Sequence, residues 1–131
     1  MTRQEQIATL INEHSSLTVT IHAGGLPLQN YVTETDGSEI FGCAKVEKLA
    51  WYLAEISHLV VEPTSRGRGL GQNLVRQACD RARKSKARIA QCTIRMDNVA
   101  SRKLFRKLGF TEGAAFNGPS GARVSVWQKE L

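Results

Sequence analysis

Two side chains that could act as general bases lie three residues apart in AEISHLVV, residues 54–61. Glu55 supplies a carboxylate, and His58 supplies an imidazole whose unperturbed pKa of about 6.5 suits proton transfer near neutral pH. The segment is apolar and rich in β-branched residues, so it predicts a strand, whose period of two places Glu55 and His58 on opposite faces. Structural roles compete with catalysis: Glu55 could pair with a basic neighbour, and His58 could be a histidine at the edge of the core.

A glycine-rich segment with two arginines follows directly, RGRGLG at residues 66–71. Backbone N–H groups exposed by glycines at the start of a helix attract phosphates, and the charges of Arg66 and Arg68 strengthen that attraction. The alternating glycines match neither the Walker A loop nor the dinucleotide-binding fingerprint. A glycine turn without a ligand is the alternative, but a pyrophosphate site accounts for the glycines, the arginines and the strand-to-helix position together.

The hydrophobic periodicity predicts the elements that must position these residues. Asp36 and Gly37 indicate a hairpin turn, and Gly109 is predicted to end a helix in the left-handed conformation. Whether residues 48–50 form a turn or continue a strand stays open. This order of elements predicts an α/β (α+β) domain with a mixed sheet. The expected helices are Thr2–His14, 72–88 and Asn98–Leu108, and the expected strands are Leu17–His22, 31–34, 39–49, 51–61, 89–95 and 124–131.

The composition suits one domain over residues 1–131, because 41% of the 131 residues are hydrophobic. We find neither an apolar run of about 18 residues nor a signal peptide, so we expect a cytoplasmic protein without a membrane partner. The three cysteines, Cys43, Cys79 and Cys92, lack metal-ligand spacing, so we expect reduced, buried thiols and no metal.

The net charge of +6 is unevenly distributed along the chain. Residues 66–107 hold 13 of the 18 basic residues but only two of the 12 acidic ones, which gives +11 there and −5 elsewhere. This region is therefore expected to meet an anion.

Two segments together resemble a known family. RGRGLG, preceded by LVVEP and followed by an amphipathic segment, resembles the acyl-CoA-binding motif of the GNAT N-acetyltransferase superfamily. DNVASRKLFRKLGF, residues 97–110, is similar to the second block of that family, N-x-x-A-x-x-L-Y-x-K-x-G-F. The resemblance implies a GNAT-like fold, with a central mixed, mostly antiparallel twisted sheet flanked by helices and splayed strands that form the acyl-CoA cleft. Residues 32–46 and 53–63 also weakly resemble the amino-acid N-acetyltransferases.

The resemblance implies an enzyme that transfers acetyl from acetyl-CoA to a primary amine by direct attack in a ternary complex. It implies Glu55 as the general base, because some members carry a glutamate there, and His58 is the second catalytic candidate. Asn98 could equally be an ordinary residue at a helix N-terminus. The positions that the resemblance assigns to binding acetyl-CoA are Leu59, Val60, Val61, Arg66, Gly67, Arg68, Gly69, Leu70, Gly71, Gln72, Asn98, Arg102 and Phe105.

Two departures from the family pattern leave alternatives open. Phe105 stands where members often carry a tyrosine that protonates the leaving thiolate, so a catalytically weak acyl-CoA-binding or sensor protein is an alternative. The acceptor-side region 1–30 is short, which implies a shallow acceptor groove or one completed in a homodimer. The acceptor, a small molecule or a protein, stays open. A basic nucleic-acid-binding protein is a less favoured alternative, because the basic segment 76–88 brings no aromatic residue for base stacking.

Overall fold

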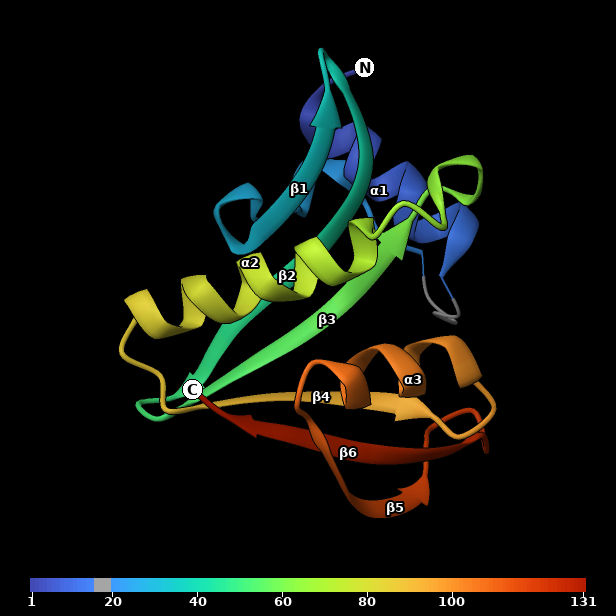
Figure 1. Ribbon diagram of the computed structural model, residues 1–131. Helices are drawn as coiled ribbons and strands as arrows, with labels where there is room; N and C mark the ends of the chain where they lie inside the picture. The colour runs from blue at the N-terminus through green and yellow to red at the C-terminus, as the bar shows by residue number, and fades with distance from the viewer. Residues whose placement is uncertain (16–19) are drawn as a thin grey trace.

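A computed structural model describes residues 1–15 and 20–131 of the chain (Figure 1). In these residues one six-stranded sheet has the strand order β1-β2-β3-β4-β6-β5. Neighbouring strands are antiparallel except β3 and β4, which are parallel. The strands are β1 (Tyr31–Asp36), β2 (Glu39–Ala50), β3 (Leu53–Val61), β4 (Ile89–Arg95), β5 (Thr111–Asn117) and β6 (Arg123–Glu130).

Helices cover both faces of this sheet (Figure 1). Helix α1 (Arg3–His14) packs on one face of β2 and β3, whereas α2 (Leu70–Lys84) and α3 (Val99–Lys107) lie on the other. A capping box between Thr2 and Glu5 starts α1. Short 3-10 turns span Ala23–Gly25, Leu28–Asn30 and Pro63–Ser65.

The alternation of side chains along β2 creates two separate hydrophobic clusters. Ala44 and Val46 face α2 and join the larger cluster, in which Trp127 of β6 is completely buried. Cys43 faces the opposite way and packs with Ile7 of α1 in the second cluster. The sheet is therefore a buried middle layer at β2 and β3, with one hydrophobic cluster on each face.

Strands β3 and β4 separate soon after they pair. Their parallel register joins Leu53–Glu55 to Ile89–Gln91 and then stops. Beyond Glu55, β3 continues to Val61 beside β2, while β4 continues beside β6, so the two strands diverge (Figure 1). Among the described residues, the β3 backbone after Glu55 thus has no strand on its β4 side, and this is the splay that the resemblance implied.

Most of the expected elements are confirmed, and the mixed α/β fold is confirmed with them. The open question at residues 48–50 is answered by β2, which continues to Ala50 before a turn at Trp51 and Tyr52. The expectation of a strand at Leu17–His22 is wrong for residues 20–22, which are not in a strand, and residues 17–19 lie outside the described residues. Strand β5 was not predicted. None of the described helices is long and apolar enough to cross a membrane.

Candidate active site

Strand β3 carries a β-bulge next to the splay. Cys43 pairs with Val60 and Lys45 pairs with Ser57, so three steps along β3 oppose two along β2. His58 is the extra residue, and its φ of +50° lies in the left-handed region that side chains rarely adopt. The backbone of a functional candidate is therefore held in an uncommon conformation.

The bulge changes which face each side chain occupies. Before it, Ile56 faces the α2 cluster, so Glu55 faces the α1 side; after it, Val60 faces the α1 cluster. His58 also points to the α1 side, since its ring meets Tyr31 of that cluster. The expectation that Glu55 and His58 lie on opposite faces is therefore wrong, because a period of two fails across an extra residue.

Tyr31 and His58 form a polar pair on that face. The Tyr31 hydroxyl lies 2.8 Å from His58 Nδ1, although the residues are 27 positions apart. Burial raises the pKa of Tyr31 to about 12, so its hydroxyl remains protonated at neutral pH. Burial and the nearby charge of Lys45 lower the pKa of His58, so the imidazole is neutral at pH 7. No sequence motif linked Tyr31 to this site.

Glu55 lies where the splay begins. It pairs with Glu47 on β2 and with Gln91 on β4, and the pair with Gln91 is the last before the strands separate. Its side chain is half-buried. The carboxylate thus projects from the closed end of the splay on the α1 side, within a row of polar cross-strand neighbours.

The glycine loop joins the open end of β3 to α2. Gly67 and Gly69 have φ of +84° and +76°, which favours glycine, and a Cβ at either position would meet no atom within 4 Å. Gly69 is the N-cap of α2, and no side chain in residues 1–15 or 20–131 caps this helix. The N–H groups of the first turn are therefore left for another acceptor.

The neighbouring residues of the loop have structural contacts. Arg66 and Arg68 are exposed, and Arg66 Nε donates to the Val61 carbonyl at 3.2 Å. A Cβ at Gly71 would lie 3.4 Å from Leu104 Cδ2 of α3. Gly71 thus allows α2 to approach α3 closely beside the splay, whereas the two preceding glycines serve the loop conformation.

Two motif residues on α3 have clear structural roles. Asn98 is the N-cap, and its side-chain oxygen accepts from the Ser101 N–H at 3.1 Å. Phe105 is 3% exposed and packs edge-to-face on Phe110, with ring centroids 5.0 Å apart. Contacts of Asn98 and Phe105 with acetyl-CoA stay predictions.

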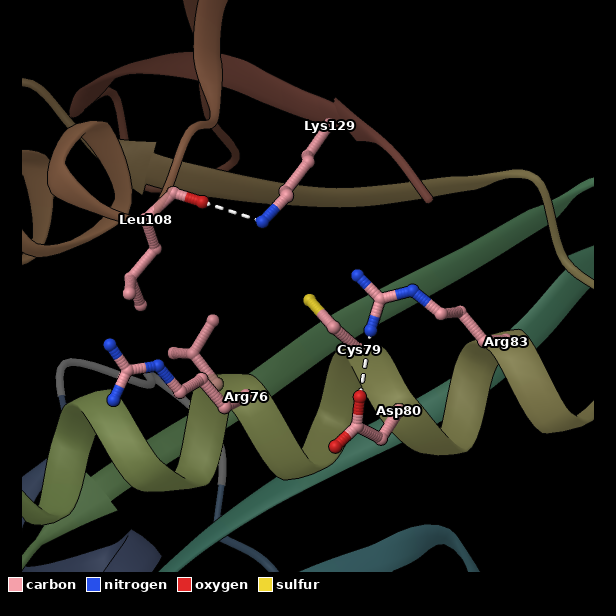
Figure 2. Close-up of a pocket in the computed structure, with 7 residues that line it drawn as sticks. Arg76, Cys79, Asp80, Arg83, Leu108 and Lys129 are labelled. Atoms are coloured by element: carbon pink, nitrogen blue, oxygen red, sulfur yellow. Dashed lines mark hydrogen bonds and ion pairs between the residues drawn. The ribbon is translucent and has the colours of Figure 1, made fainter.

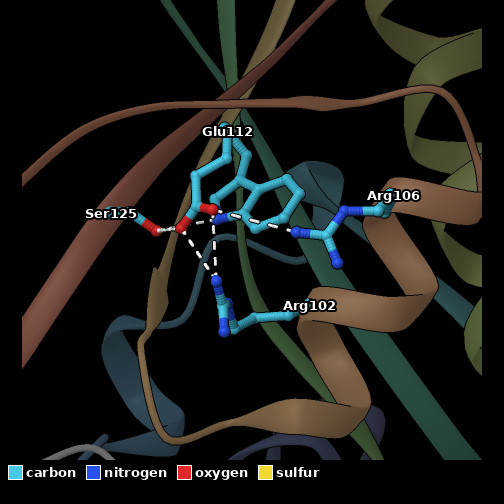
Figure 3. A network of polar contacts seen from close by, with 5 residues as sticks. Arg102, Arg106, Glu112 and Ser125 are labelled. Carbon is cyan, nitrogen blue, oxygen red and sulfur yellow. Dashed lines mark hydrogen bonds and ion pairs between the residues drawn. The ribbon is translucent and has the colours of Figure 1, made fainter.

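Arg102 is held in a polar network on the outer half of the sheet (Figure 3). Its Nη2 lies 3.1 Å from Glu112 Oε1, and the Ser125 hydroxyl donates to Glu112 Oε2 at 2.8 Å. Arg106 Nη2 lies 3.8 Å from the same Glu112 Oε1, and Trp127 Nε1 donates to the Ser125 hydroxyl at 2.9 Å. This network accounts for the Nη2 group of Arg102, and the role of Arg102 in acetyl-CoA binding stays a prediction.

We expect Glu112→Gln to lower the melting temperature by roughly 3–6 °C at pH 7. The hydrogen bond from Ser125 and the charge of Arg102 hold the pKa of Glu112 below its usual range. A lowered folded-state pKa contributes stability above the unfolded value of about 4.3, and this stability is lost as pH falls through the folded value. Thermal melts of both proteins between pH 7 and pH 3 measure how the difference between their melting temperatures depends on pH. A difference that stayed constant to pH 3 would contradict the role of the carboxylate charge.

A separate hollow of about 170 Å³ lies between α2 and β6 (Figure 2). Arg83 pairs with Asp80 at 2.7 Å, and Lys129 Nζ donates to the Leu108 carbonyl at 2.8 Å. Cys79 Sγ lies beside them, but burial raises the pKa of this thiol, so it stays protonated at neutral pH. The expectation of free, buried cysteines is confirmed for all three.

The chain matches the model of the Acetyltransferase (GNAT) family over residues 4–110. An uncharacterized N-acetyltransferase of Methanocaldococcus jannaschii is 33% identical over 50% of this chain and 29% of its own length. The N-alpha-acetyltransferase RimI of Mycobacterium tuberculosis is 31% identical over 64% of this chain and 53% of its own length. The chain thus matches about half or less of the length of these curated relatives.

The fold is also shared with solved structures. The structure of Ard1 from Thermoplasma volcanium superposes with a TM-score of 0.84 at 17% identity, covering 99% of this chain and 94% of that one. At this identity the likeness shows the fold, and the family match rests on the sequence. With both motifs and the splayed strands in place, the chain belongs to the GNAT acetyltransferase family.

Proposed function

We propose that the protein is an N-acetyltransferase that transfers the acetyl group of acetyl-CoA to a primary amine in a ternary complex. The observation that carries the proposal is the parallel β3–β4 pairing, which stops after Glu55 and leaves the β4 side of the β3 backbone without a described partner strand as far as the glycine loop. A strand edge can pair with an extended amide-bearing chain, and the uncapped start of α2 suits a pyrophosphate. Both features belong to one continuous segment, residues 56–72.

Acetyl-CoA would supply an activated thioester. This chain would bind it and accept a proton from the amine. Val60 and Val61 offer backbone groups, while the N–H groups at Gly69 to Gln72 and the charge of Arg68 favour phosphates. The open space at Gly67 and Gly69 leaves room for a ligand against the backbone. No group of three or more His, Cys, Asp or Glu in residues 1–15 and 20–131 is arranged to hold a metal.

Glu55 is the proposed general base, and His58 with Tyr31 shapes the acceptor side. An amine must lose a proton to become a nucleophile, and Glu55 projects from the fork of the splay where an acceptor would approach. His58 is neutral at pH 7 and bonded to Tyr31, so it adds no positive charge to repel a cationic amine. This division gives each of the two catalytic candidates a distinct role.

We propose a polypeptide α-amino group as the acceptor. The RimI relative bears the name N-alpha-acetyltransferase, which supports this class. The α1-side face of β4 and β6 also has no helix over it in the described part of the chain, and Thr93 and Gln128 are exposed there. An open face of this kind can accommodate an extended peptide.

The test uses acetyl-CoA labelled in its acetyl group. Peptides with a free N-terminus and no lysine, the same peptides blocked at the N-terminus with one lysine, and free amino acids are compared, with mass spectrometry of the products. Label on the free N-terminus supports the proposal. Label on lysine or amino acids alone would overturn the acceptor class, and acetyl-CoA binding without transfer to any amine would favour the sensor alternative raised by Phe105.

A further inference from the structure

Three of the exposed large apolar side chains in the described part of the chain gather at the β2–β3 turn. Trp51 is 74% exposed, Leu49 51% and Tyr52 39%. The Trp51 and Tyr52 rings lie edge-to-face with centroids 5.3 Å apart, so they form one aromatic unit. Such a cluster on the surface of a small protein marks an interaction site more often than isolated apolar residues do.

Hydrogen bonds join this turn to the turn between α2 and β4. The Tyr52 carbonyl accepts from the N–H groups of Arg88 and Ile89 at 2.7 and 2.9 Å. Lys48 Nζ donates to the Ser85 carbonyl at 2.6 Å. Figure 1 shows both turns at the same end of the sheet, near the C-terminus. The backbone that carries the aromatic rings is therefore joined to the α2–β4 turn.

That neighbour is strongly basic. Lys84, Lys86 and Arg88 are exposed on the α2–β4 segment, and Lys48 adds a fourth positive charge. Acidic residues nearby are Glu47, which precedes Lys48 on β2, and Glu130, whose backbone pairs with Ile89 at the start of β4. Three of the four cations thus lie on a segment that is hydrogen-bonded to the aromatic turn, although the sequence separates Lys84, Lys86 and Arg88 from that turn by more than 30 residues.

We propose that this aromatic–basic surface, formed by Lys48, Leu49, Trp51, Tyr52, Lys84, Lys86 and Arg88, binds single-stranded RNA. Phosphates pair with the cations, and unpaired bases stack on the aromatic rings; RNA presents such bases in loops and ends. The sequence of the basic segment contains no aromatic residue for base stacking, but the fold places the turn with Trp51 and Tyr52 beside it. Double-stranded RNA fits this surface less well, because its bases are stacked inside the duplex. A membrane fits less well too, because three apolar side chains on a turn form a smaller apolar face than an interfacial helix does.

The surface lies at the opposite end of β3 from the glycine loop, where we propose that the pyrophosphate of acetyl-CoA binds. Strand β3 runs nine residues from Leu53, next to the aromatic turn, to Val61 before the glycine loop. At a rise of about 3.3 Å per residue this separates the two ends by about 26 Å. Bound RNA would therefore leave the glycine loop accessible, and the proposal does not depend on the acetyl transfer.

The intrinsic tryptophan fluorescence of the protein can be used to detect binding at this surface. It has two tryptophans, and Trp127 is completely buried, so an RNA-dependent change in emission reports on Trp51. Titration with a ten-nucleotide oligouridylate at low salt is expected to quench the emission saturably, with an affinity that falls steeply as salt rises. Anisotropy of a labelled oligonucleotide is expected to show about fivefold or weaker binding for Trp51→Ala.

A matched pair of charge reversals separates this surface from general basicity. Lys86→Glu is expected to weaken RNA binding by about tenfold, since it removes one phosphate contact and adds repulsion. Lys103→Glu makes the same change at an exposed position on α3 and is expected to change binding by less than about twofold. Circular dichroism checks that each variant is folded.

Several results would overturn the proposal. These are no saturable quenching at low salt, equal losses for Lys86→Glu and Lys103→Glu, and equal affinity for a blunt RNA duplex. Binding of Trp51 to anionic phospholipid vesicles without any RNA binding would assign the surface to a membrane, and a Trp51-dependent dimer that excludes RNA would assign it to a second copy of the chain.

Discussion

Glu55→Gln is expected to lower kcat by about 10²–10⁴-fold, the usual contribution of a general base, with acetyl-CoA affinity changed by less than about threefold. The amide keeps the size and polarity of the side chain at the fork of the splay but cannot accept the proton from the amine. The measurement is steady-state kinetics with the best acceptor, together with calorimetric titration by acetyl-CoA. A fall in kcat without loss of binding is the pattern expected for a residue that acts in the chemical step.

Two control variants make this result specific. Glu47→Gln makes the same change on the cross-strand neighbour and is expected to cost less than about fivefold. His58→Asn removes the imidazole with a residue that tolerates a positive φ, so the bulge is retained. If His58→Asn abolished turnover while Glu55→Gln did not, the base would be His58 and our assignment would be wrong.

The sequence predicted most elements of the fold because their signals are local. Leu74, Ala78 and Ala82 repeat at helical spacing, and all three are buried in α2. Gly109 ends α3 with a φ of +92°, as its position predicted. The sequence did not predict strand β5, because this strand is largely exposed and contains Gly113 and two alanines, which have low strand preference.

The candidate site was predicted less completely, because its geometry depends on contacts between distant residues. The glycine loop is visible as a motif, since its conformation is set by consecutive residues. The bulge at His58 is set by the register between β2 and β3, and no local pattern shows an extra residue. Tyr31 meets His58 only because β1, β2 and β3 are neighbours. The aromatic–basic surface likewise needs the fold, since its two turns are joined by hydrogen bonds between separate segments.

The second large effect is expected at the glycine loop, where Gly69→Glu should weaken acetyl-CoA binding by at least about 100-fold. The new carboxylate would occupy the open space at the start of α2, where we propose that the pyrophosphate lies. Two like charges about 4 Å apart near a protein surface repel by roughly 4 kcal/mol, which exceeds the roughly 2.7 kcal/mol that a 100-fold change requires. Calorimetric titration with acetyl-CoA measures the affinity directly.

Gly37→Glu is the matched control, because the chain offers a second glycine of the same kind. Gly37 has a φ of +60° in the β1–β2 turn, and a Cβ there would also meet no atom within 4 Å. Both variants force a side chain into the left-handed region, at about 1–2 kcal/mol each, and both add one negative charge. Their melting temperatures should therefore fall alike, while only Gly69→Glu loses acetyl-CoA. If both variants lost it equally, the loss would come from general destabilisation or charge. Full binding by a folded Gly69→Glu protein would mean that the phosphates do not lie on the start of α2, and the glycines would then serve the loop conformation alone.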